Sequence, residues 1–141
     1  MKLVEEKGGR EFLIRMDHDA DLLDSIHGLA DSQGIRLGIF TGIGALKEAE
    51  ISYYDQARKE YIKNELNGPL EIANLVGNIS IKEEKIFVHA HAILSERDGR
   101  TYSGHFERGK IFACELYIRE LVGEELVRSY DDTTGLFLWR N

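Results

Sequence analysis

The sequence predicts an α+β fold, a single compact domain with a largely antiparallel β-sheet and one main helix near the N-terminus. Two observations support this prediction. Apolar residues recur at clear helical spacing in one early segment, whereas most of the later chain consists of short apolar or alternating runs rich in β-branched residues. The length of 141 residues fits one domain, residues 1–141, which can bury about two thirds of its unfolded surface.

The predicted helix follows a first strand at residues 11–16. The aspartate-rich stretch from Asp17 to Asp21 is typical of a helix start, because carboxylates there accept hydrogen bonds from free backbone amides and suit the positive end of the helix dipole. Leucine, isoleucine and alanine then recur at helical spacing, so we expect a helix from about residue 20 to residue 33. Gly34 is the expected end of that helix.

Strands are predicted for most of the remaining chain. Gly42-Ile-Gly44 indicates a tight turn, with the alternative that its free amides line a pocket near the histidines, and Asn67-Gly-Pro69 indicates a break. Residues 70–81 show some helical spacing, but the β-branched Ile79 and Ile81 favour a long, bent strand. The nine strands expected after the helix are residues 35–41, 48–54, 61–66, 70–81, 86–94, 100–106, 111–121, 126–130 and 136–139.

Three of the five histidines lie between residues 89 and 105. His89 and His91 are two apart on a predicted strand, so their side chains point to the same face. A two-residue loop of Asp98-Gly99 would place His105, on the returning strand, on the opposite face. A three-residue loop, Arg97 to Gly99, would place His105 directly across from His91. Both loops fit locally, and only the second, or another of the same parity, brings the three histidines together.

Three neutral imidazoles that converge from strands suit Zn²⁺, and also iron, nickel or copper ions. Three protein ligands leave one coordination position for water or a substrate, whereas purely structural zinc sites usually have four. His89, His91 and His105 are therefore candidate ligands of a divalent transition metal, with zinc as the first choice. A single strand histidine is more often a hydrogen-bonded or surface residue, and that interpretation remains the alternative.

Other reactive residues fall outside this pattern. His18 and His27 are expected on the surface of the helical region, away from any ligand cluster. Cys114 lies in an apolar strand and is expected to be a buried small hydrophobe. Phe137 and Trp139, in the last predicted strand, are expected to pack in the core or in a subunit interface, because exposed aromatic residues promote aggregation.

Composition indicates a soluble protein of a reducing compartment, and a cytoplasmic location is expected. A single cysteine excludes an intrachain disulfide. The N-terminus is charged and contains no apolar signal core, and no apolar run is long enough to span a bilayer. The formal net charge is −7, and the basic residues form no run. Because DNA binding needs a basic surface that displaces counterions, the charge does not favour a nucleic-acid partner.

Six motifs follow one another along the chain: Asp21-Leu-Leu-Asp24, residues 34–46, Gly77-Asn-Ile-Ser80, His89-Ala-His91, Asp98-Gly99 and Ser103-Gly-His105. In this order they resemble the plants-and-prokaryotes conserved (PPC) domain family over nearly the whole chain. The resemblance implies a compact α/β domain, commonly a homotrimer, and a zinc-type site formed by the three histidines in prokaryotic members. The family is also described as predicted DNA-binding proteins, and its plant members carry a basic AT-hook that this chain lacks.

Three functional hypotheses follow. The first is a metal-binding oligomeric domain with a small ligand or substrate at the open metal position. The second is a DNA-binding or regulatory module, as the family description suggests. The third is a cupin-like metalloenzyme, although Glu96 follows His91 by five residues and is a poor match to the cupin glutamate. Glu107 and Asp98 are the best carboxylate helpers, but spacing secures neither, so catalytic and cofactor-binding residues stay unassigned and the question of an enzyme stays open.

Overall fold

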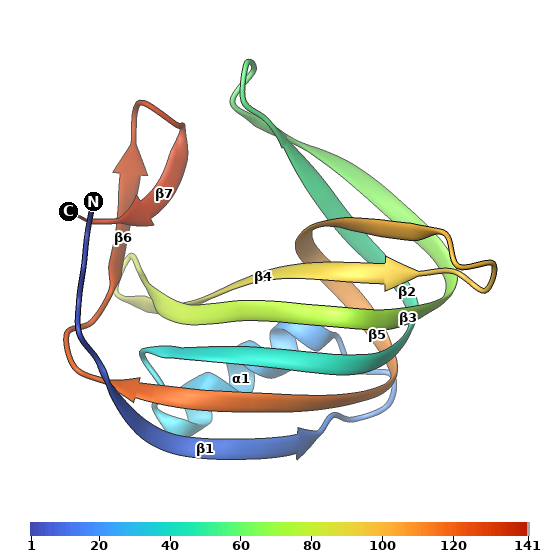
Figure 1. Cartoon of the computed structure of the whole chain (residues 1–141), viewed down its shortest axis with the longest axis horizontal. Coiled ribbons are helices and arrows are strands. Elements are labelled where there is room, and N and C mark those ends of the chain that lie inside the picture. The colour runs from blue at the N-terminus through green and yellow to red at the C-terminus, as the bar shows by residue number, and fades with distance from the viewer. Residues whose placement is uncertain (141) are drawn as a thin grey trace.

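The computed structural model describes residues 1–140, and within them the chain forms seven strands and one helix (Figure 1). The sheet is mostly antiparallel and the helix is short, which confirms the predicted fold class. The elements are β1 (Lys7–Arg15), α1 (Leu22–Gln33), β2 (Gly38–Asp55), β3 (Glu60–Lys82), β4 (Lys85–Ser95), β5 (Thr101–Val122), β6 (Val127–Asp131) and β7 (Leu136–Trp139).

All seven strands belong to one sheet with the order β1-β5-β2-β3-β6-β7. Strand β4 pairs with both β3 and β5, so β2, β3, β4 and β5 form a closed ring of paired strands. The pairing is antiparallel except between β3 and β6, where Ile81 and Lys82 lie beside Val127 and Arg128 in parallel. This short parallel contact brings the C-terminal part of the chain next to the end of β3.

The core lies on the side of the sheet that α1 covers, which is the far side in Figure 1. On β4 the small and aliphatic side chains of Val88, Ala90, Ala92 and Leu94 alternate toward this core. The side chains between them, including His89, His91 and Ile93, therefore point away from it. We call this side of the sheet the outer face; it also carries Ile39, Ile43 and Val76.

Helix α1 begins and ends as the sequence predicts. Asp21 is the N-cap residue, and its Oδ1 accepts hydrogen bonds from the backbone amides of Leu23 at 2.9 Å and Asp24 at 3.0 Å. Gly34 ends the helix in the left-handed conformation, with φ of 66°. Leu22, Ile26 and Ala30 form its buried stripe. The helix has 12 residues, and within residues 1–140 no helix is long and apolar enough to cross a membrane.

The predicted turn at Gly42-Ile-Gly44 and the predicted break at Asn67-Gly-Pro69 are both wrong, because each segment lies inside a continuous strand. The β2–β3 register shifts between Gly42 and Gly44, and again between Leu46 and Glu48. Such bulges bend a strand without ending its hydrogen-bond ladder. At Gly44 a Cβ would lie 2.2 Å from the Ala113 carbonyl oxygen, so glycine allows two backbones to approach closely. Residues 35–54, 61–81 and 100–121 thus contain one long strand each rather than two.

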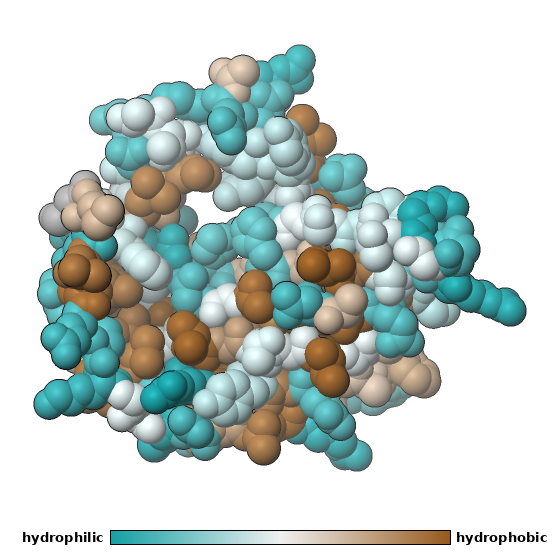
Figure 2. Space-filling model, viewed as in Figure 1, coloured by the Kyte–Doolittle hydropathy of each residue, from teal (hydrophilic) through white to brown (hydrophobic). Residues whose placement is uncertain are grey.

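Two hairpins project beyond the body of the sheet, one at the distal ends of β2 and β3 and the other formed by β6 and β7 (Figure 1). Their tips are joined, since the Tyr54 hydroxyl donates to the Thr134 carbonyl at 2.7 Å and Lys59 donates to the Asp132 carbonyl at 2.6 Å. Figure 2 shows the surface hollowed between these hairpins and the sheet. Phe137 and Trp139 lie on β7 and are not part of the core of this chain, contrary to one of the two expectations for them.

Candidate metal centre

The β4–β5 hairpin has the three-residue loop that the sequence left as one of two possibilities. His91 is paired with His105, and Ser95 with Thr101. Gly99 takes a φ of 82° and donates its amide to the Glu96 carbonyl at 2.9 Å. This register places His105 beside His91 on the outer face and confirms the expected parity.

The three histidine side chains converge above β4 and β5. Each offers a ring nitrogen, and these nitrogens all lie within 4.8 Å of one another. The ring centroids are 5.0 Å apart for His89 and His105, 5.3 Å for His89 and His91, and 5.5 Å for His91 and His105. Two strands of a hydrogen-bonded sheet hold all three backbones, so the cluster rests on a rigid base.

The environment of the cluster keeps its buried imidazoles neutral. Burial, reinforced by His105, Arg128 and His91, lowers the pKa of His89 to about 4. Burial also lowers the pKa of His105, although the nearby charge of Glu107 opposes that shift. The Nδ1 atom of His105 is buried and has no hydrogen-bond partner among residues 1–140. Neutral imidazoles with a free nitrogen are the form in which histidine binds metals.

A divalent metal ion fits this donor set after a small adjustment of the rings. A tetrahedral zinc site with Zn–N bonds of about 2.0–2.1 Å places its nitrogens about 3.4 Å apart. The nitrogens lie within 4.8 Å of one another, so at most small side-chain rotations bring them to that spacing. The unpartnered Nδ1 of His105 has no protein hydrogen bond in the described chain that such a rotation would break.

The three carboxylates considered as helpers of the histidines, Glu107, Asp98 and Glu96, lie in different parts of the structure. Glu107 is half-buried and accepts a hydrogen bond from the Ser52 hydroxyl at 2.7 Å, and its charge reaches His105 and Tyr61. Asp98 and Glu96 instead lie at the β4–β5 turn, where both form ion pairs with Arg100. Glu107 is therefore the candidate that the fold places near the cluster, and the cupin-like role weighed for Glu96 is not supported.

The remaining reactive residues lie apart from the cluster, as the sequence predicts. His18 and His27 are exposed, and their ring nitrogens lie 2.7 Å from the Phe112 carbonyl oxygen and 3.1 Å from the Ile86 carbonyl oxygen, respectively. Cys114 is buried in the core, and burial raises the pKa of its thiol to about 11. Such a thiol is a poor nucleophile near neutral pH.

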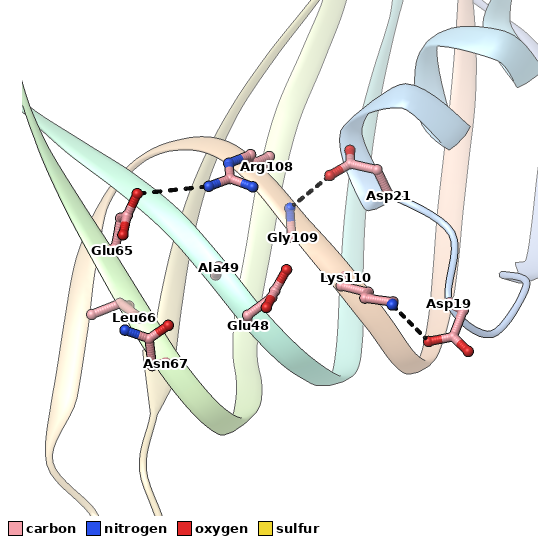
Figure 3. Close-up of a pocket in the computed structure, with 10 residues that line it drawn as sticks. All are labelled: Asp19, Asp21, Glu48, Ala49, Glu65, Leu66, Asn67, Arg108, Gly109 and Lys110. Carbon is pink, nitrogen blue, oxygen red and sulfur yellow. Dashed lines mark hydrogen bonds and ion pairs between the residues drawn. The ribbon is translucent and has the colours of Figure 1, made fainter.

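A second hollow, between the N-terminal end of α1 and strands β2, β3 and β5, carries many charged side chains (Figure 3). Most of these charges are already engaged with one another. Arg108 lies 3.8 Å from Glu65, Lys110 lies 3.4 Å from Asp19, and Asp21 accepts the Gly109 amide while it caps the helix. This hollow of about 430 Å³ is therefore mainly a region of structural ion pairs. It leaves fewer polar side chains free to contact a ligand than the histidine cluster does.

A cavity of about 310 Å³ lies next to the histidines, under the β6–β7 hairpin. Its walls include His89 and His105 together with Tyr61, Lys82 and Arg128. The Tyr61 ring lies 5.0 Å from that of His105, and burial raises the pKa of Tyr61. Sequence reasoning missed Tyr61, Lys82 and Arg128, because each comes from a different strand end and none stands in a local motif.

Arg128 is the most buried cation of this cavity wall. Its Nη2 atom lies 3.5 Å from His89 Nδ1, and burial lowers its pKa. The guanidinium donates to the Ser80 hydroxyl, the Asn78 side-chain oxygen and the Phe137 carbonyl, all at 2.9–3.0 Å. Asn78 and Ser80 belong to the Gly77–Ser80 stretch noted in the sequence, so that motif positions the arginine beside His89.

Residues 3–122 match the family model of the Plants and Prokaryotes Conserved (PCC) domain. The chain belongs to this family. The match covers the histidine hairpin and all of the sheet except β6 and β7. The family resemblance noted from the sequence motifs is therefore confirmed, under the PPC name used above.

Solved structures with the same fold include relatives at moderate identity. A metal-containing protein from Archaeoglobus fulgidus is 44% identical, with a TM-score of 0.97 and full coverage of both chains. A plant- and prokaryote-conserved protein from Pyrococcus horikoshii is 35% identical, with a TM-score of 0.95, and the match covers 100% of this chain and 98% of that one. A protein from Ralstonia eutropha JMP134 named “Putative DNA-binding protein” is 26% identical, with a TM-score of 0.83 over 92% of this chain and 90% of that one.

One curated relative is much longer than this chain. The bifunctional protein GlmU from Synechococcus sp. (strain JA-3-3Ab) is 26% identical over 129 residues, which are 89% of this chain and 20% of that protein. The chain thus spans about a fifth of that relative.

Proposed function

We propose that this protein binds a divalent transition metal, with zinc as the first choice, through His89, His91 and His105. A small ligand or substrate takes the remaining coordination position. The observation that carries the proposal is the convergence of three ring nitrogens within 4.8 Å on a rigid hairpin. The low pKa of His89 and the unpartnered Nδ1 of His105 support it, because a metal would use both features. The 44% identical relative from Archaeoglobus fulgidus is a metal-containing protein, which supports it further.

When bound, a zinc ion held by three histidines supplies a Lewis acid with one open position. The chain provides the surroundings of that position. The β6–β7 hairpin and Tyr61 line the cavity beside His89 and His105. Arg128 places a positive charge beside His89, and Ser52 holds the Glu107 carboxylate near His105.

The proposal is tested by competitive titration with a colorimetric zinc chelator. The parent and the single variants His89→Ala, His91→Ala and His105→Ala are compared in protein purified without an affinity tag. Each variant should bind zinc at least about tenfold more weakly, since even changes beyond the direct ligands commonly cost 10- to 100-fold in affinity.

His18→Ala and His27→Ala are matched controls, because both side chains are exposed and lie outside the cluster. They should bind zinc as the parent does. If His105→Ala binds zinc as tightly as the parent, the three-histidine site is wrong.

We also propose that the protein assembles as a homotrimer, the state that the family resemblance implies. The outer face exposes Ile39, Ile43, Val76 and Ile93 around the exposed His91, and apolar patches of this kind are typical of subunit interfaces. Figure 2 views the side of the sheet away from α1 and shows apolar side chains scattered among polar ones. Light scattering at micromolar concentration should report three chains; a monomer would refute this assembly.

DNA binding is the second candidate, because the relative from Ralstonia eutropha JMP134 carries a DNA-binding name. The net charge of −7 argues against it for this chain alone. We therefore expect weak or no binding to duplex DNA at physiological ionic strength. Submicromolar binding that weakens as salt increases, measured by fluorescence anisotropy, would promote this candidate over the first.

A further inference from the structure

Two residues with a formal charge are buried in the described chain, and their surroundings differ. Glu50 forms ion pairs with Lys63 at 2.7 Å and with Arg108 at 3.4 Å. Arg128 is 8% exposed and has no carboxylate within 4.0 Å among residues 1–140. Its hydrogen-bond acceptors, on Ser80, Asn78 and Phe137 and, at 3.5 Å, on His89, are all neutral. Burial of a charge costs less when an opposite charge accompanies it, so an anion that enters the cavity beside Arg128 would interact favourably with it.

A second cation faces the same cavity without an acidic partner. The Nζ atom of Lys82 lies 3.8 Å from the centre of the Phe137 ring and 5.4 Å from that of Phe87. Arg128 lies 5.1 Å from the same Phe87 ring. In the part of the chain that the structure describes, no carboxylate lies within 4.0 Å of Lys82 either. The lining of the cavity thus carries two cations and no carboxylate, although the protein as a whole is acidic and the charge of Glu107 reaches His105 and Tyr61.

This charge also bears on the proposed metal site. The guanidinium of Arg128 lies 3.5 Å from a ring nitrogen of His89, and a divalent cation held by that histidine would be repelled by it. An anion that contacts both removes the conflict, because it interacts favourably with each positive centre. The position of Arg128 therefore favours an anionic ligand over a neutral one.

The N–H groups of Arg128 and the apolar lining of the cavity indicate which class of anion fits. A guanidinium has five N–H groups. The bonds to Ser80, Asn78 and Phe137 use three, and Nη2 directs a fourth toward His89 Nδ1 at 3.5 Å, which leaves one free on Nη1. The free Nη1 donor can bond one oxygen of a carboxylate, and the long Nη2 contact with His89 can give way to the second oxygen. The neighbouring walls are aromatic or aliphatic, from Phe87, Leu136 and Phe137, and they suit an apolar body better than a heavily hydrated phosphate.

We propose that the cavity between the histidine cluster and the β6–β7 hairpin binds a small organic carboxylate. Arg128 holds its charged group next to His89, and its apolar body lies against Phe87 and Phe137. This inference rests on the proposed function and deepens it, because it names the class of ligand at the open metal position. The cavity volume of about 310 Å³ is at the lower end of the range for small-molecule sites, which fits a ligand with a single ring or a short chain.

The test is calorimetric titration of zinc-loaded protein with benzoate, compared with its neutral isostere benzamide and with inorganic phosphate. We expect benzoate to bind at least about tenfold more tightly than benzamide, the difference that one charge-assisted hydrogen bond gives. Arg128→Gln should lower benzoate affinity by a similar factor, whereas Arg97→Gln, at the exposed β4–β5 turn, should leave it unchanged. The benzoate and benzamide comparison uses the parent protein, so it holds even if the Arg128 variant folds poorly.

The outcomes separate this inference from the metal proposal. If the protein binds no zinc in the chelator titration, the metal proposal fails. The carboxylate inference is then tested separately, by comparing the benzoate affinity of the metal-free parent with that of metal-free Arg128→Gln protein. Equal benzoate affinity for parent and Arg128→Gln protein overturns it and leaves Arg128 as a structural link between β3, β6 and β7. The absence of benzoate binding to either form, or Arg128-dependent binding of phosphate instead, also overturns it.

Discussion

Gly77→Ala should destabilise the protein strongly, because Gly77 sits where β3 passes between a core aromatic ring and the backbone of the histidine strand. A Cβ at this position would lie 2.2 Å from Cζ of Phe40 and 2.3 Å from the carbonyl oxygen of His89. Ordinary contacts begin near 3.4 Å, so both neighbours would have to move by more than an ångström. Phe40 is buried and the His89 oxygen belongs to a paired strand, so neither can rotate away.

Overpacking of a core typically costs about 1–3 kcal/mol, and the backbone contact places this variant at the upper end, about 3 kcal/mol. With a urea dependence of about 2 kcal/mol per molar, the unfolding midpoint should fall by about 1.5 M at fixed protein concentration. Because His89 is displaced, zinc affinity should fall in the same variant.

Gly28→Ala is the matched control, since a Cβ at Gly28 on α1 meets no atom within 4 Å. Alanine is the better helix former, so this variant should be more stable than the parent by up to about 1 kcal/mol. If the two glycine variants unfold at the same urea concentration, the close packing described at Gly77 is wrong.

Three further predictions concern the helix, the buried histidine and the cysteine. Asp21→Ala should lower the free energy of unfolding by about 1–2 kcal/mol through loss of the helix cap, measured by urea denaturation, whereas the exposed Asp31→Ala should have little effect. In metal-free protein the free energy of unfolding should decrease as the pH falls from about 6.5 to about 4, because unfolded His89 binds a proton in that window and folded His89 does not; His89→Gln should show a smaller decrease. Cys114 should react with a thiol reagent slowly in the native protein and rapidly in urea, and equal rates would contradict its burial.

Local chemistry was sufficient to predict the elements whose causes are local. Asp21 and Gly34 define the ends of α1 through contacts within a few residues of each, and the sequence marks both. The β4–β5 loop is also determined locally. Gly99 adopts the positive φ that the three-residue loop requires, and that loop sets the register in which His91 pairs with His105. The fold class and the members of the histidine cluster follow from these features.

The features that sequence reasoning missed depend on partners far along the chain. Gly42 and Gly44 resemble turn residues locally, but the neighbouring β5 backbone keeps the strand continuous through a bulge. Arg128 reaches His89 because β6 pairs in parallel with the end of β3, and the two segments are about 45 residues apart in the chain, so no local pattern reports that contact. The positive cavity beside the histidines therefore required the three-dimensional structure.

The most direct test of the metal site is elemental analysis of the protein purified without an affinity tag and without added metal. Inductively coupled plasma mass spectrometry of the parent should find about one divalent transition metal ion per chain, with zinc the main element, as expected for one site with three histidine ligands. A triple variant in which His89, His91 and His105 are all alanine should contain almost none. A metal-free parent that also fails to take up added zinc, or a triple variant with the same metal content as the parent, would contradict the account.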